Sequence, residues 1–209
     1  MHDALTLCCR FLKDRMCSDN CIGIYKLADT FGCEDLKMAA SRFVLRHFVH
    51  VARVSDEFVQ LPLDDLLQFM ERDDLNVKNE RVVFEAVERW IGHSVHTRTP
   101  CVEKLLSKVR LSLLDCGYLM NTVKCHEYVK YSLECQKLII SAFMSILHLD
   151  PRSTNEVARP RLPSSVLFAF GGWSGESPIN AMECYDSRAG AWVNVPVTGE
   201  IPRGYHPPP

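Results

Sequence analysis

A short module near the C-terminus constrains the fold more than any other feature of the chain. An apolar run of strand character begins at Val166 and ends in the glycine pair Gly171-Gly172. A second run of strand character ends at Tyr185, and Trp192 opens a third run after a turn. Repeat units of this size form a core only together with neighbouring units, because one unit cannot bury its own faces. The module therefore predicts one β-unit of a larger assembly.

Residues 1–150 show the apolar spacing of consecutive amphipathic helices. Ser18 is the expected N-cap of the second helix, and Gly32 is expected to end that helix in the left-handed conformation. The inward stripe of the first helix is formed by Leu5, Cys8, Cys9, Leu12 and Met16. A third helix is predicted with an inward face formed by Leu36, Ala40, Phe43, Phe48 and Val51.

The later helices carry recognisable start signals. Pro62 suits the first turn of a helix, and Asn79 and Ser132 are the expected N-caps of two further helices. The helix that contains Trp90 is expected to bury a wide face, whereas residues 93–100 are polar and predict a loop. Short helices with short connections favour an antiparallel helical array.

The helical pattern stops at a segment rich in proline and arginine. This segment, residues 151–163, predicts a linker. The chain is then expected to consist of a helical domain at 1–150, the linker, the β-unit at 164–196 and a proline-rich tail at 197–209. Within the β-unit, Val166 to Phe170 is predicted as a buried strand.

Composition excludes several classes of function. The 209 residues carry a net charge of −2, which gives no electrostatic footprint for nucleic acid or for an anionic membrane. No apolar run approaches the ~20 residues of a membrane span, and the N-terminus does not read as a secretory signal. We therefore expect a cytoplasmic protein with reduced and mostly buried cysteines, among them Cys8, Cys9, Cys21 and Cys135.

Neither a metal site nor an active site is predicted. Cys17 and Cys21 have no matching second pair of ligands, and His93 and His96 fall in the expected loop. The chain has no glycine-rich phosphate loop and no recognisable pair of nucleophile and base, so no cofactor and no catalysis are expected. The acidic pair Asp73-Asp74 is interpreted as a solvated position near a helix end.

The helical region resembles the BACK domain of kelch-like proteins. The matching stretches are Cys9–Leu12, Asn20–Ile24, Asp74–Glu80, Val83–Trp90 and Lys108–Leu113. The C-terminal module resembles a single kelch repeat through its glycine pair and the pair Tyr185 and Trp192. The resemblance implies a mainly α fold, in which an antiparallel helical BACK domain is followed by an incomplete β-propeller blade. Of the family's BTB domain, only the last helix is matched, by residues 1–7.

The resemblance also implies a function, that of a non-catalytic substrate adaptor in a cullin-3 RING ubiquitin ligase. Its partners would be cullin-3 and an unidentified protein substrate. The cullin-binding helix pair of the family, the 3-box, falls on Leu7 to Ala28. The candidate cullin contacts are Phe11, Leu12, Met16, Ile22 and Tyr25, although periodicity alone would place most of them in the core.

Other interpretations stay open at the level of sequence. The chain could act as a truncated competitor of the complete adaptor, or as a structural scaffold like the kelch proteins associated with actin. Trp173 is expected near a blade loop, and the basic residues Arg203 and His206 fall where the first strand of the next blade would begin. In the family, polar and basic residues on blade loops often face the substrate. In a single blade, however, we expect Arg203 and His206 to belong to a disordered tail.

Overall fold

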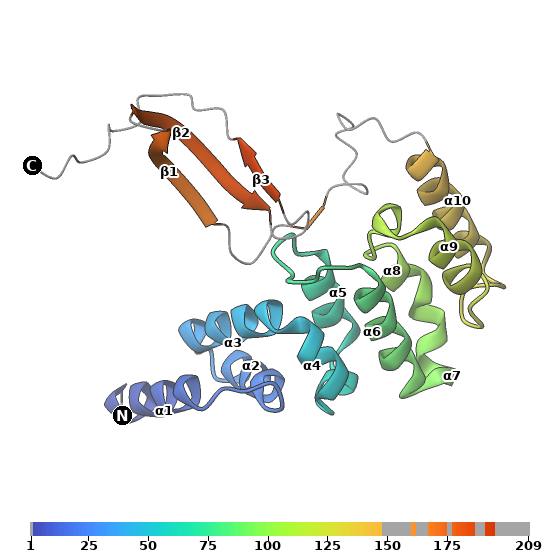
Figure 1. Cartoon of the computed structure of the whole chain (residues 1–209). Coiled ribbons are helices and arrows are strands. Elements are labelled where there is room, and N and C mark those ends of the chain that lie inside the picture. The colour runs from blue at the N-terminus through green and yellow to red at the C-terminus, as the bar shows by residue number, and fades with distance from the viewer. Residues whose placement is uncertain (1, 148–159, 162–166, 175–176, 187–190, 195–209) are drawn as a thin grey trace, which may run out of the picture. The chain divides into compact units, whose positions relative to one another are not determined.

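The computed structural model describes residues 2–147, 160–161, 167–174, 177–186 and 191–194. The chain divides into two compact units, Met1–Leu162 and Pro163–Pro209. The first unit is helical, and the second holds a small antiparallel sheet (Figure 1). The predicted mainly α fold with a small C-terminal β-unit is therefore confirmed.

The first unit is a succession of helices and helical turns whose apolar faces share one core. Its first half contains α1 (His2–Asp14), α2 (Cys21–Thr30), α3 (Glu34–Arg46), α4 (Phe48–Val54), the 3-10 turn η1 (Phe58–Gln60) and α5 (Leu63–Glu71). Its second half contains α6 (Arg81–Gly92), α7 (Val95–Arg98), η2 (Thr99–Cys101), α8 (Val102–Leu106), η3 (Leu111–Leu113), α9 (Cys116–Tyr118), the π-helical turn η4 (Leu119–Val123) and α10 (Leu133–Leu147).

Helix α6 provides the wide buried face that the sequence predicts. Its buried side chains are Val83, Phe84, Ala86, Val87, Trp90 and Ile91. The indole N–H of Trp90 donates to the carbonyl of Leu61 at 2.9 Å, so the one polar atom of this side chain is satisfied inside the core. The helix thus joins the two halves of the helical unit.

Two of the predicted helix-end signals, at Gly32 and Ser132, are confirmed. Gly32 follows α2 with a φ of 63°, a conformation that costs glycine little. The hydroxyl of Ser132 accepts the N–H of Cys135 at 3.2 Å, as expected for an N-cap of α10. The prediction for Asn79 is off by one residue, because Glu80 occupies the N-cap position of α6, although the amide oxygen of Asn79 accepts the N–H of Arg81 at 2.9 Å. The prediction for Ser18 is wrong, because Asn20 occupies the N-cap position of α2.

The predicted third helix is two helices in the structure. It breaks at His47, which separates α3 from α4. Asn76 explains the break, since its backbone N–H donates to the Leu45 carbonyl at 3.0 Å and its side chain donates to the Arg46 carbonyl at 2.9 Å. A residue 30 positions away therefore takes the carbonyls with which α3 would otherwise continue.

The loop predicted at residues 93–100 is largely helical, which corrects the sequence interpretation. Helix α7 and the turn η2 occupy most of it. Arg98 fixes this segment, because its guanidinium donates to the carbonyls of Val59 at 2.7 Å and Trp90 at 2.6 Å. The polar composition of the segment reflects these contacts as well as its exposure to solvent.

The second unit contains β1 (Leu167–Ser174), β2 (Ser177–Asp186) and β3 (Ala191–Asn194), paired antiparallel in the order β1-β2-β3. Gly171 and Gly172 have φ values of 64° and 135°, and the register of β1 on β2 shifts there. Tyr185 faces Trp192 across β2 and β3, with ring centroids 5.3 Å apart.

The strand at residues 166–170 is not buried, contrary to the prediction. Leu167 is 60% exposed and Phe170 is 64% exposed. The reason is that apolar side chains project from both faces of β1, and the described residues of this unit form only three strands, with no second layer over either face. Residue 166 itself lies outside the described residues.

Candidate partner-binding site

The predicted 3-box falls on α1, the turn after it and α2. Asn20 organises the turn, because its amide oxygen accepts the N–H of Cys17 at 2.8 Å and its amide nitrogen donates to the carbonyl of Arg15 at 3.0 Å. Helix α1 packs against α3, and α2 packs against α3 as well. The two helices are thus held by α3 on one side and leave another side to solvent.

Two of the five candidate cullin contacts lie in the core. Ile22 is fully buried and Tyr25 is 5% exposed. The ring of Tyr25 contacts Phe69 with centroids 5.4 Å apart, and its hydroxyl donates to the carboxylate of Asp65 at 3.4 Å. Burial, followed by the charge of Asp65, raises the pKa of Tyr25. Ile22 and Tyr25 therefore anchor α2 in the core of the helical unit.

The other three candidates lie on α1 and at its end. Phe11 is 60% exposed, whereas Leu12 and Met16 are half-buried and pack on the core. The guanidinium of Arg15 lies 5.6 Å from the centroid of the Phe11 ring. The structure thus separates the five candidates into an exposed residue, two at the edge of the core and two inside it.

Five further apolar residues near this helix pair are exposed, and one of them, Leu5, was predicted on the inward stripe of the first helix. They are Leu5 and Leu7 of α1, Leu27 of α2, Phe31 after α2 and Met38 of α3, which are 43–67% exposed. Leu7 and Phe11 are four positions apart and therefore share one side of α1, opposite to the side that Cys9 and Leu12 turn to the core. In the sequence, a second apolar side on the first helix, formed by Leu7 and Phe11, was the signal that could have revealed this exposed surface.

Glu57 binds the first turn of α2 through its carboxylate. Its carboxylate accepts the N–H of Gly23 at 2.7 Å. A Cβ at position 23 would lie 2.5 Å from the same carboxylate, so only glycine leaves room for this contact. The negative charge lies at the N-terminal turn of α2, where the helix dipole favours it.

The expectation that the four named cysteines are buried needs a correction. Cys21 and Cys135 are buried, Cys9 is half-buried and Cys8 is exposed. Cys8 lies beside the exposed side of α1 that carries Leu7, whereas Cys9 packs on the core. All ten cysteines are free thiols in the structure.

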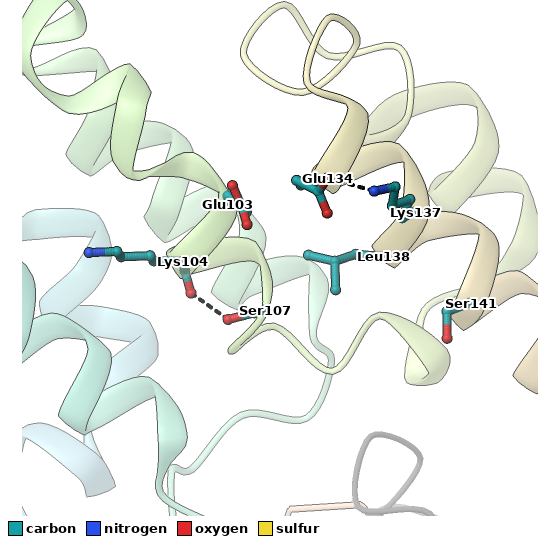
Figure 2. A pocket seen from close by; sticks show the side chains of 7 residues that line it. All are labelled: Glu103, Lys104, Ser107, Glu134, Lys137, Leu138 and Ser141. Carbon is teal, nitrogen blue, oxygen red and sulfur yellow. Dashed lines mark hydrogen bonds and ion pairs between the residues drawn. The ribbon is translucent and has the colours of Figure 1, made fainter.

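A hollow of about 390 Å³ lies between α8 and α10 (Figure 2). It is lined by Glu103, Lys104, Ser107, Glu134, Lys137, Leu138 and Ser141. Lys137 is paired with Glu134 at 2.6 Å, and the Ser107 hydroxyl donates to the Lys104 carbonyl at 2.7 Å. Its four charged side chains are all exposed, and two of them, Glu134 and Lys137, are paired with each other, so the hollow does not arrange groups for chemistry.

The remaining predicted features add little to a site. Among the described residues, no cluster of three or more His, Cys, Asp or Glu side chains could hold a metal ion. Asp73 is less solvated than expected, since it pairs with the buried Arg110. Trp173 is 62% exposed on β1, and Arg203 and His206 lie outside the described residues.

Comparison with known families identifies both units. The family model "BTB And C-terminal Kelch" (BACK) matches residues 21–124, and the Kelch motif model matches residues 165–196. The chain belongs to the kelch-like family. It is 39% identical over 192 residues to kelch-like protein 17 of Mus musculus and of Rattus norvegicus, which covers 88% of this chain and 30% of each relative.

Kelch-like protein 17 of Homo sapiens is 38% identical over the same length, again with 88% of this chain covered and 29% of the relative. The chain thus spans about 30% of the length of these kelch-like relatives. In the part of the chain that the structure describes, no helix is long and apolar enough to cross a membrane.

Proposed function

We propose that this chain contributes the BACK domain and a kelch repeat to a substrate adaptor of a cullin-3 RING ubiquitin ligase. Such an adaptor performs no chemistry and acts by raising the effective concentration of substrate near the conjugating enzyme. Membership of the kelch-like family supports the proposal. Its partners would be cullin-3 and a protein substrate, and its location would be the cytoplasm.

The observation that carries the cullin contact is the exposed apolar side of α1. Leu7 is 66% exposed and Phe11 is 60% exposed, on a helix whose opposite side packs on the core through Cys9 and Leu12. Large apolar side chains on a rigid helix are the kind of anchor that helix-mediated interfaces use. Leu12 and Met16 would contribute at the edge, and Ile22 and Tyr25 would act only by holding α2 in place.

The test is a titration of the cullin-3 N-terminal domain with the chain and with its Phe11→Asp variant. We expect the variant to keep its fold, because the side chain is exposed, and to lose at least about tenfold in affinity, as a central aromatic anchor does. Leu133→Asp is the matched control, since Leu133 is 78% exposed at the first position of α10. Equal affinities of the two variants would reject the α1 contact.

A folded chain that binds cullin but supports no ubiquitin transfer would favour the competitor role over the adaptor role. The readout is ubiquitination of a substrate by the complete ligase as the chain is added. Inhibition that depends on Phe11 would identify competition at the same contact. Absence of cullin binding by the unmodified chain would remove both roles for this chain.

A further inference from the structure

Arg161, which the sequence places in the linker, is buried inside the helical unit. Its side chain is 1% exposed and forms a fork with Glu80, with Nε 2.5 Å from one carboxylate oxygen and a terminal nitrogen 3.1 Å from the other. The other terminal nitrogen donates to the carbonyls of Met70 and Arg72, each at 2.8 Å. The guanidinium is therefore bound by four hydrogen bonds to partners at least 81 positions away.

The partners of Arg161 are the ends of two helices. Met70 and Arg72 supply carbonyls at the C-terminal end of α5, where a helix carries partial negative charge and lacks internal donors. Glu80 occupies the N-cap position of α6 and also accepts the backbone N–H of Arg110 at 3.2 Å. Arg161 thus joins the negative end of α5 to a carboxylate at the positive end of α6.

Only an arginine fits this socket fully. The planar guanidinium presents parallel donors that match a carboxylate, and its remaining donors reach the two carbonyls at the same time. A lysine would offer a single ammonium and could not satisfy all of these acceptors. Arg110 lies next to the socket and pairs with Asp73, so a second cation is committed to a different carboxylate.

We propose that Arg161 is a positioning residue, a latch that fixes the point at which the chain leaves the helical unit for the kelch unit. The sheet begins at Leu167, so five residues connect it to the latch when the latch is closed. When the latch is open, the connection runs from the end of α10 at Leu147 and has nineteen residues, 148 to 166. The latch therefore shortens the connection between the two units of the chain.

The physical consequence is a change in reach. A chain segment spans at most about 3.5 Å per residue, so loss of the latch, which lengthens the connection from five to nineteen residues, increases its maximal span nearly fourfold. In an adaptor, this connection limits how far the substrate-binding part can move from the cullin-binding part. The latch itself rests on the geometry of the helical unit and does not depend on the cullin contact.

The test uses limited trypsin digestion of the full chain, with the cut sites identified by mass spectrometry. Trypsin must take the Arg161 side chain into its own pocket, so a closed latch protects the bond between Arg161 and Leu162. We expect Glu80→Gln to speed cleavage of this bond by about tenfold or more, because charge-assisted hydrogen bonds are lost. Glu71→Gln, which removes an exposed partner of Lys108, is the control and should leave cleavage unchanged.

The pattern of trypsin cleavage sites distinguishes a latch from a general stabilising contact. Local release predicts faster cleavage after Arg161 alone, whereas loss of stability would expose sites throughout the helical unit together. If Glu80→Gln lost its helical far-UV signal, the Arg161→Lys variant would be tested in its place. Trypsin also cleaves after lysine, so the folded variant should be cut after residue 161 faster than the unmodified chain. The proposal is overturned if the folded, unmodified chain is cut after Arg161 as fast as the same chain unfolded in urea. It is also overturned if the folded variant is cut after residue 161 no faster than the unmodified chain.

Discussion

Single polar side chains fix several segments whose composition alone indicates loops. Arg98 reaches the carbonyls of Val59 and Trp90, and its guanidinium lies 4.0 Å from the centroid of the Trp90 ring. Burial lowers the pKa of Arg98, which nevertheless stays far above neutral as an arginine. The residue thus ties α7 to α6 and to the segment before α5.

The first prediction at this scale concerns Arg98. Arg98→Ala should lower the free energy of unfolding by about 2–3 kcal/mol, because two charge-assisted hydrogen bonds and a cation–π contact are lost. Urea unfolding monitored by circular dichroism measures the change. Arg42→Ala, at an exposed position on α3, should alter stability by no more than about 0.5 kcal/mol. Equal effects of the two substitutions would contradict the role of Arg98.

The second prediction concerns the buried thiol of Cys21. Burial, followed by the nearby Glu57 carboxylate, raises the pKa of this thiol from 9.0 to about 12. In the unfolded chain the thiol ionises from about pH 9, so stability is retained below that pH and is lost as pH rises between the two values. The loss has a limiting slope of about 1.4 kcal/mol per pH unit.

Cys21→Ala removes this titration. The difference in unfolding free energy between Cys21→Ala and the unmodified chain should therefore change as pH rises above about 9, with the unmodified chain losing more. Urea unfolding at neutral and at alkaline pH measures it. A difference that is independent of pH would show that the thiol is not protected in the folded state. The exposed Cys8 should be alkylated in the native chain, and Cys21 should not.

At the scale of elements, close contact decides where a helix tolerates substitution. Gly23 and Gly92 both lie in helices, yet a Cβ would meet the Glu57 carboxylate at position 23 and nothing within 4 Å at position 92. Helix propensity alone would favour alanine at both positions by up to about 1 kcal/mol. We therefore expect the contact with Glu57 to reverse the sign of the stability change on alanine substitution at position 23 and not at position 92.

We predict that Gly23→Ala destabilises the chain by about 1 kcal/mol, because Glu57 must move and its hydrogen bond to the N–H of residue 23 is lost. Gly92→Ala should be neutral or stabilising. Thermal or urea unfolding of the two variants gives the comparison. In the double variant Gly23→Ala with Glu57→Ala, the unfolding free energy should recover part of the gain expected from helix propensity. If its change were the simple sum of the changes in the two single variants, the contact would be contradicted.

At the scale of the whole molecule, the two units differ in how much apolar surface they bury. The helical unit shares one continuous core, whereas the sheet exposes Phe168, Phe170 and Trp192 by 46–64%. Three strands without a covering layer have little independent stability. We therefore expect amides of β1 to β3 to exchange with solvent faster than those of α10.

Hydrogen exchange followed by mass spectrometry tests this expectation. Amides in the strands at 167–174 and 177–186 should exchange through local opening, whereas those in α10 should require opening of the helical core. Equal protection of the sheet and α10 would contradict it. In that case a surface that covers the sheet must exist in solution, for example in an oligomer, and sedimentation of the same sample would detect it.

Much of the fold and part of the site follow from sequence, where the signal is local. The stripe of α6, the left-handed Gly32 and the cap at Ser132 depend on neighbours within about two helical turns, so periodicity and residue type predict them. The glycine pair and the pairing of Tyr185 with Trp192 follow likewise from one compact motif.

The sequence by itself determined the helical array, the change to strands after the proline-rich segment and the membership of the kelch-like family. Only the tertiary structure decided that Tyr25 lies inside while Phe11 faces solvent, that α3 ends at Arg46, and that Arg161 belongs to the helical unit. These outcomes depend on contacts between residues 30 to 91 positions apart. Periodicity reports only which side of a helix is apolar, whereas the packing of distant elements decides which apolar or charged groups are buried.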